Sequence, residues 1–173
     1  MLDKLVETIL NFIQLFKFWD VLQPWEEGTR VRLGKYPEPV KVLEAGFHWI
    51  IPFTIDVIHT VSIARQATEL GSQTITTLDD KCIVLEAVLT YEIEDIEKAL
   101  FKVGDEISAV KERIQSIIRN EIVKTNFNEI NSEALEESIN DKSKKEGNKW
   151  GIKVVSVSIK SLGKITSIRL INQ

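Results

Sequence analysis

The sequence holds little of what catalytic and metal sites are built from. Its single cysteine, Cys82, excludes a disulfide within the chain, and its two histidines, His48 and His59, have no second thiol for a zinc pattern. No G-x-S-x-G elbow, P-loop or dinucleotide fingerprint occurs. The adjacent carboxylates Asp79 and Asp80 fall in a predicted turn, where such residues usually solvate the backbone. We therefore expect no catalytic residue, no metal site, no cofactor and no enzymatic activity.

Charge of one sign is also lacking. The 22 basic and 26 acidic residues are interleaved and leave a formal net charge of −4, so no basic stripe is available for a phosphate backbone, and nucleic acid is not an expected partner. At 173 residues and 43% hydrophobic content, the chain is able to bury one core or two small lobes. The lone cysteine favours a reducing compartment, and we expect the domain to be cytoplasmic.

No apolar run approaches the ~20 residues of a membrane span, yet the N-terminus is apolar on one side. At 100° per residue, eight large apolar residues fall within an arc of roughly 160°, which predicts an amphipathic helix ending near Phe18. We assign residues 1–22 to a membrane-associating segment. The residues predicted to contact the membrane are Leu2, Leu5, Val6, Ile9, Leu10, Phe12, Ile13, Phe16 and Trp19.

Two other uses of this helix stay open, since it is able to pack on its own domain or to dock a partner protein. Residues 1–22 hold two lysines against three acidic residues, so insertion into lipid would have to depend on apolar contact. A secretory signal is not expected, because acidic residues interrupt the start of the chain.

Residues 24–63 favour short strands and turns, and all four prolines precede residue 53. Strands are predicted at 30–33 and 47–51. Between them residues 30–41 are locally basic, and either form an ordinary solvated face or meet lipid headgroups. The candidate headgroup contacts are Arg30, Arg32, Lys35 and Lys41.

A period of two from residue 55 to residue 63 predicts a further strand. Val57 and His59 fall on its apolar side, and we expect His59 to be a core residue. Asp56 falls on the opposite, polar side.

The rest of the chain predicts a hairpin, then helices, then a strand. Residues 72–77 and 82–94 form the hairpin around the turn at 78–81, and alternate residues from Ile83 to Ile93 make its apolar face. One amphipathic helix follows Asp105 as N-cap. A further helix, acidic at its start and basic at its end as suits the helix dipole, runs from near Ser132 to Lys145, with Gly147 as its stop. A strand at 151–159 and a short apolar piece at 168–171 close the sequence. This order predicts an α+β fold with a mostly antiparallel sheet and helices packed on one side.

Five motifs then resemble the superfamily of stomatin, prohibitin, flotillin and HflK/C, the SPFH or band 7 domain. The run G-F-H-W-I-I-P-F at 46–53 resembles its G-L-H-F-x-x-P-F signature, and V-R-L-G-K at 31–35 resembles its V-x-x-x-L-G-K strand and turn. Residues 73–79, 88–99 and 151–159 are similar to its Q-x-V-x-T-x-D hairpin, its V-x-Y-x-V step into a helix and its G-I-x-V-x-x-V-x-I strand. The positions that carry the motifs are Gly34, Gly46, His48, Pro52, Phe53 and Gly151.

The resemblance implies that residues 23–173 form an SPFH domain with two lobes. It further implies peripheral or monotopic attachment to membrane lipids, and homo-oligomeric rings or cages that organise a membrane patch or hold membrane proteins such as proteases. The alternative is a peripheral adaptor that docks a partner protein through the N-terminal helix. Relatives usually continue into a coiled coil, so either the domain faces, such as the outer helix surfaces at 106–119 and 133–145, make the assembly, or the sequence is part of a longer protein.

Overall fold

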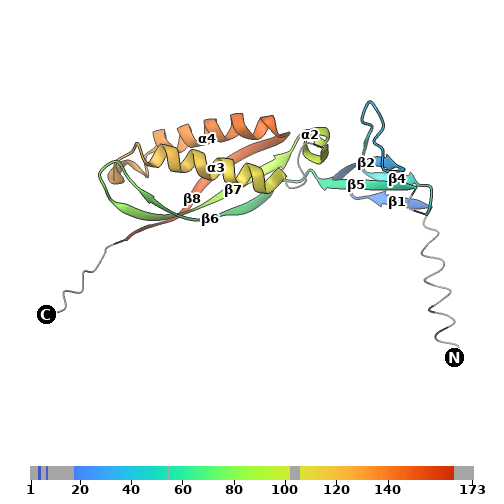
Figure 1. Ribbon diagram of the computed structural model, residues 1–173, viewed down its shortest axis with the longest axis horizontal. Coiled ribbons are helices and arrows are strands. Elements are labelled where there is room, and N and C mark those ends of the chain that lie inside the picture. Colours follow the sequence, from blue (N-terminus) through green and yellow to red (C-terminus); the bar gives the residue numbers. More distant parts are fainter. Residues whose placement is uncertain (1–3, 5–6, 8–17, 54, 102–105, 166–173) are drawn as a thin grey trace. The chain divides into compact units, whose positions relative to one another are not determined.

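The computed structural model describes Lys4, Glu7 and residues 18–53, 55–101 and 106–165. The chain divides into two compact units, Met1–Ala64 and Arg65–Gln173, which are described separately (Figure 1). Apart from Lys4 and Glu7, the predicted N-terminal helix up to residue 17 lies outside the described residues, as do the predicted cap Asp105 and the apolar piece at 168–171.

Five short strands form the described part of the N-terminal unit. Strand β1 (Trp19–Leu22) pairs antiparallel with β4 (Gly46–Trp49). A second sheet has the order β3-β2-β5 and consists of β2 (Glu26–Arg32), β3 (Val42–Leu43) and β5 (Asp56–Ser62). The strands predicted at 30–33 and 47–51 therefore exist, with bounds shifted toward the N-terminus. Because Trp19 opens β1, the segment assigned to residues 1–22 contains a strand at its end.

A tight turn follows β2. Arg32 and Lys35 exchange two backbone hydrogen bonds of 2.9 Å each, and the residues between them, Leu33 and Gly34, have φ angles of 51° and 72°. Two consecutive left-handed residues are typical of a type I′ turn, which suits glycine and disfavours leucine. Gly34 is thus explained by backbone geometry, whereas Leu33 is not.

The orientation predicted for the first residues of β5 is wrong, although Thr60 is exposed and Val61 half-buried as expected. Asp56 is only 4% exposed, whereas Val57 is 40% exposed and His59 lies at the surface. Pairing of Arg32 with Asp56 in the β2–β5 register brings the two side chains together, and the guanidinium satisfies the buried carboxylate. An ion pair thus outweighs the apolar alternation that the sequence pattern favoured.

The C-terminal unit is an antiparallel sheet of order β6-β7-β8 with helices on one face (Figure 1). Its strands are β6 (Gln66–Thr76), β7 (Cys82–Ile93) and β8 (Ile152–Lys164). Its helices are α2 (Ile96–Phe101), α3 (Glu106–Ile122), the short 3-10 helix η1 (Phe127–Glu129) and α4 (Glu133–Lys149). The α+β fold with helices on one side is confirmed.

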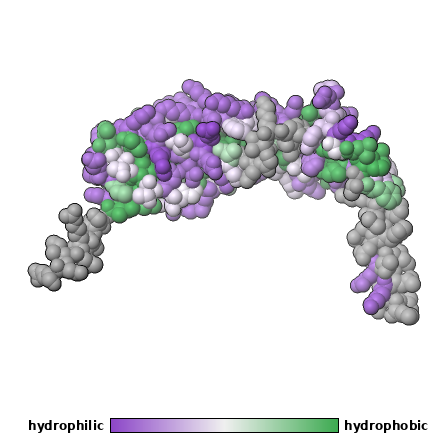
Figure 2. Space-filling model, viewed as in Figure 1, coloured by the Kyte–Doolittle hydropathy of each residue, from purple (hydrophilic) through white to green (hydrophobic). Residues whose placement is uncertain are grey.

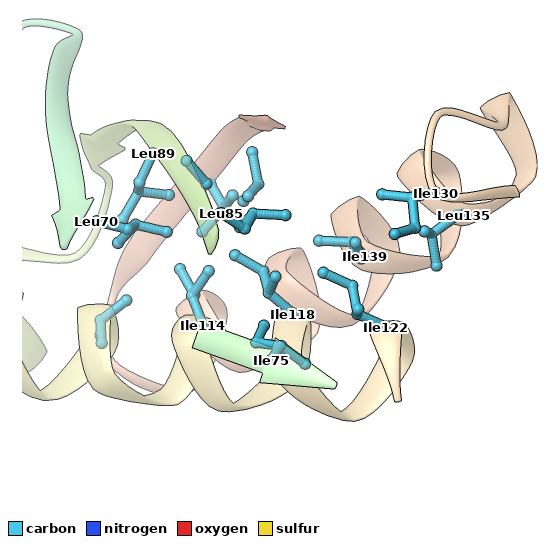
Figure 3. Close-up of a cluster of buried hydrophobic side chains, with 14 of the residues drawn as sticks. Leu70, Ile75, Leu85, Leu89, Ile114, Ile118, Ile122, Ile130, Leu135 and Ile139 are labelled. Carbon is cyan, nitrogen blue, oxygen red and sulfur yellow. The ribbon is translucent and has the colours of Figure 1, made fainter. Parts of the chain in front are cut away.

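Alternate side chains of β7 point into the core of this unit, as predicted. Figure 3 shows them opposite isoleucines of α3 and residues of α4. The residues that fill this core include Leu70, Ile75, Ile83, Leu85, Leu89, Ile114, Ile118, Ile122, Ile130, Leu135 and Ile139. The apolar period of α3 therefore predicted its part of the core correctly, whereas Leu135 and Ile139 of α4 were not identified from the sequence.

Gly147 does not stop the second helix, because α4 continues to Lys149. A Cβ at Gly147 would lie 2.6 Å from the Ile152 carbonyl oxygen, so glycine permits close packing of α4 on β8. The helix ends where Gly151 adopts a φ of 75°. Strand β8 then extends beyond the predicted residue 159, since its last residues pair with the start of β7, Lys164 opposite Ile83.

Candidate membrane-facing surface

The two units differ sharply in where they place apolar side chains. Of the 22 buried hydrophobic residues of the described chain, only Leu22, Val31 and Leu43 belong to the N-terminal unit. Of the 15 large hydrophobic residues that are exposed within the same described part of the chain, 12 belong to it: Phe18, Trp19, Val21, Trp25, Leu33, Tyr36, Val42, Phe47, Trp49, Ile51, Phe53 and Val57. Figure 2 shows part of this hydrophobic surface on the face of the unit that is in view. A unit that exposes more large apolar side chains than it buries indicates an interaction surface.

One face of the β1–β4 pair carries four of these residues. Trp19 lies opposite Trp49 and Val21 opposite Phe47 in the register, and all four are exposed. The Phe47 and Trp49 rings meet edge to face, with centroids 5.3 Å apart. Side chains alternate along a strand, so these residues share one face while His48 lies on the other. Trp19 thus belongs to the exposed face of a strand, not to the predicted helix.

Two neighbouring turns carry further exposed apolar side chains. Leu33 is 73% exposed and Phe53 is 60% exposed, and both have left-handed backbones, with φ angles of 51° and 63°. The Leu33 amide donates to the Ile55 carbonyl at 2.7 Å, which places the two turns side by side. Left-handed geometry disfavours large side chains and water disfavours exposed apolar ones, so neither residue is placed there to stabilise the fold.

The chain enters the unit at the same place. The Ile50 amide donates to the Phe18 carbonyl at 2.8 Å, directly beside the Trp19–Trp49 pair. We call the set Phe18, Trp19, Val21, Leu33, Phe47, Trp49, Ile51 and Phe53 the apolar end. The predicted amphipathic helix therefore joins the unit at its apolar end.

A basic cavity of about 1000 Å³ lies in the same unit. The four candidate headgroup residues, Arg30, Arg32, Lys35 and Lys41, all line it. The structure thus brings together four cations that the sequence placed only within one basic segment. Leu33 belongs both to this cavity and to the apolar end.

The four cations differ in how they are held. Arg32 donates to both carboxylate oxygens of Asp56, from Nε at 2.7 Å and from Nη2 at 3.1 Å, and the Ile51 amide donates to Asp56 Oδ2 at 3.1 Å. The Arg32 hydrogen bonds hold the pKa of Asp56 below its usual range, against the opposing effect of burial. Arg30 Nη2 donates to the Trp49 carbonyl at 2.6 Å. Within the described residues, Lys35 and Lys41 form no ion pair.

The comparisons with known proteins decide the family. The family model of the SPFH domain / Band 7 family matches residues 20–164. The chain belongs to this family. Its members are generally non-enzymatic, membrane-associated scaffolds or regulators. The match begins within β1 and ends at the last residue of β8, so it spans both units.

Individual relatives agree with the family match. An uncharacterised protein of Methanothermobacter thermautotrophicus is 29% identical over 94% of this chain, and one of Methanocaldococcus jannaschii is 29% identical over 89%. The stomatin-like protein stl-1 of Caenorhabditis elegans is 30% identical over 90% of this chain. The chain spans 50%, 78% and 45% of these relatives' own lengths, respectively.

The motif residues of the SPFH domain lie in turns, at the start of a strand, or where two backbone segments approach closely. Gly34 occupies the turn after β2, Gly46 opens β4 with a φ of 137°, and Gly151 approaches Asp95, where a Cβ would lie 2.6 Å from the carbonyl oxygen. His48 Nε2 lies 2.8 Å from the Glu44 carbonyl oxygen, which ties β4 to the preceding turn. Pro52 and Phe53 form the turn before β5.

Most of the apolar end was missed as a site by reasoning from the sequence. Trp19 was expected there, but Phe47, Trp49 and Leu33 were read only as parts of strands, turns and a family motif. A signal existed in W-I-I-P-F at 49–53, an apolar run that contains a proline and is therefore not able to continue as a regular buried strand. The other predicted membrane contacts lie outside the described residues.

No described helix meets the length and apolarity needed to cross a bilayer. In the same part of the chain, no three His, Cys, Asp or Glu side chains are grouped closely enough to bind a metal ion.

Proposed function

We propose that this protein is a membrane-attached scaffold. Its N-terminal unit inserts the apolar end into the surface of one leaflet, and the N-terminal segment adds an amphipathic anchor. The observation that carries the proposal is that, among the residues the structure describes, 12 of the 15 exposed large hydrophobic ones lie in the N-terminal unit.

The size of the surface is sufficient for attachment. Trp19, Phe47 and Trp49 are each about half exposed or more, so at roughly 200 Å² per aromatic side chain they present about 340 Å². Transfer of that area out of water is worth about 8 kcal/mol before ordering and immobilisation costs, at ~25 cal/mol per Å². An N-terminal amphipathic helix would add to this term.

The type of residue favours lipid over a protein partner. Trp and Tyr concentrate at membrane interfaces, where the ring is apolar and the polar edge reaches water. The apolar end is bordered by a cavity lined with four cations, which suits a headgroup layer. The second candidate function, an adaptor that docks a protein through its N-terminal helix, would leave the exposed face of β1 and β4 without a role.

Self-assembly would give the scaffold its function. Among the described strands β6 pairs only with β7, so its other edge is open to a neighbouring copy. The outer helix faces are weaker candidates than the sequence suggested, because Lys142 is bonded to Glu121 at 2.6 Å within the same chain. Confinement to a membrane raises the effective concentration of copies, and weak contacts then suffice.

Flotation with vesicles of phosphatidylcholine alone tests the attachment. The full chain should float, and the Trp49→Gln/Phe53→Gln variant should float much less, because both side chains are exposed and neither fills the core. The matched control is Leu78→Gln/Val123→Gln, which removes two exposed apolar side chains from the C-terminal unit. Equal flotation of the Trp49/Phe53 variant and the unaltered chain would overturn the role given to the apolar end.

A further inference from the structure

We infer that the basic cavity of the N-terminal unit binds a dianionic phosphate monoester, in the form of the headgroup of a single anionic lipid. This inference rests on the proposed membrane attachment and adds to it a ligand class and a site. The cavity is lined by Arg30, Arg32, Lys35 and Lys41, and its volume of about 1000 Å³ exceeds that of a phosphate group several-fold.

The charge of the cavity is only partly compensated. Four cations and one carboxylate, Glu44, line it, and Asp56 is bonded to Arg32, so these six groups together carry two surplus positive charges. Arg30 has a protein acceptor in the Trp49 carbonyl, and its buried Nε has no hydrogen-bond partner among the described residues. Lys35 and Lys41 are exposed and form no ion pair within the described chain. A phosphate monoester carries roughly −1.5 to −2 at neutral pH, which matches this surplus.

The remaining lining is apolar, which distinguishes a lipid from a free phosphate. Leu33, Tyr36 and Val42 contribute apolar surface next to the cations, and all three are exposed. A soluble phosphate compound would leave this surface in water, whereas the glycerol backbone of a lipid would cover it. Leu33 also joins the cavity to the apolar end, so a lipid chain would have a continuous apolar path.

The side of β4 on which the cavity lies fits the position of a headgroup. Phe47 and Trp49 lie on one face of β4, and His48, which lines the cavity, lies on the opposite face. When the aromatic face rests on the hydrocarbon boundary, the cavity is therefore on the water side of β4, toward the lipid headgroups.

Vesicle binding with lipids of matched surface charge tests the inference. Vesicles of phosphatidylcholine with phosphatidic acid present a monoester, and vesicles with phosphatidylserine at equal zeta potential present a diester. The full chain should bind the first roughly five-fold more tightly or better, since a monoester presents up to about one more negative charge to the cavity than a diester, and one such charge interaction at a membrane surface is worth about that factor. The Lys35→Gln/Lys41→Gln variant should lose this preference. The control Lys124→Gln/Lys145→Gln, which removes the same charge from exposed positions in the C-terminal unit, should keep it.

Equal binding to the two kinds of vesicle, or a preference that survives in the Lys35/Lys41 variant, would overturn the inference. Binding of short-chain phosphatidic acid below its critical micelle concentration needs no bilayer. It therefore distinguishes a cavity that does not bind phosphate monoesters from a protein that does not attach to membranes. Amide NMR shifts confined to residues 30–48 would support the cavity even for a chain that bound no vesicle. Glycerol phosphate that bound there as tightly as the short-chain lipid would overturn the lipid assignment and indicate a site for free phosphate monoesters.

Discussion

The carboxamide of Asn140 on α4 pairs with both backbone groups of Val157 on β8. The Val157 amide donates to Asn140 Oδ1 at 2.7 Å, and Asn140 Nδ2 donates to the Val157 carbonyl at 3.3 Å. This point lies between two bulges of β8, where the β7–β8 register shifts near Tyr91 and near Ala87. A side chain therefore substitutes for a neighbouring strand at the outer edge of β8, where Val157 is buried.

Replacement of Asn140 by alanine should destabilise the protein by about 1–3 kcal/mol, because a buried amide and carbonyl lose their partners. Urea unfolding followed by circular dichroism measures the loss. Asn120→Ala, an exposed asparagine on α3, is the control and should change the stability by less than about 0.5 kcal/mol. Similar losses in the two variants would mean that the Val157 edge is not held by Asn140.

The stability of the N-terminal unit should depend on pH through Asp56. Arg32 lowers the folded pKa of Asp56 below its usual value, so the unfolded chain takes up a proton first as the pH falls. The stabilising contribution of the pair is therefore complete above the ordinary carboxyl pKa of about 3.9 and is lost as the pH falls through the depressed folded value. Asp56→Asn should cost about 1–3 kcal/mol at neutral pH, a range reduced because Arg32 is half exposed.

Tryptophan fluorescence is a suitable readout, since Trp19, Trp25 and Trp49 lie in this unit and only Trp150 lies in the other. Below pH 4 the stability difference between Asp56→Asn and the unaltered chain should shrink. A constant difference down to acid unfolding would contradict the role of the Arg32–Asp56 pair. Asp20→Asn, at a carboxylate that is not buried, provides a charge-matched comparison.

The sequence predicted the structure better in the unit with the larger hydrophobic core. In the C-terminal unit, buried residues such as Leu89 and Ile114 repeat at strand and helix periods, and the pattern was read correctly. The N-terminal unit buries few side chains, so one ion pair, Arg32–Asp56, was enough to reverse the expected orientation of the first residues of β5. The basic residues of the cavity were named from composition, but only the fold of the 30–48 segment could show that they share one cavity.

We expect Leu33 to favour lipid binding at a cost to the stability of the fold. Leu33→Asn places a residue that tolerates left-handed geometry at φ 51°, so the free energy of unfolding should rise by roughly 0.5–1 kcal/mol. The same change removes an apolar side chain from the apolar end, so vesicle flotation should fall. Thermal unfolding and flotation of one preparation measure both effects. A variant that is stabilised and still floats fully would show that Leu33 is not in contact with lipid.

Assembly should depend on membrane attachment, and the truncation that tests this has to stop at residue 17, because Trp19–Leu22 form β1. Removal of residues 1–17 should leave a folded protein that is small or monomeric by mass photometry and binds vesicles weakly through the apolar end. The full chain on vesicles should form rings or larger assemblies by electron microscopy, since confinement raises its effective concentration.

The Leu33→Asn variant of the full chain is the matched control, since it weakens attachment while leaving the N-terminal segment in place. If Leu33→Asn also reduces assembly, the loss of attachment explains the effect of the truncation. If only the truncation reduces assembly, residues 1–17 contact neighbouring copies directly. A full chain that stays monomeric on lipid would refute the scaffold and leave a peripheral adaptor as the better account.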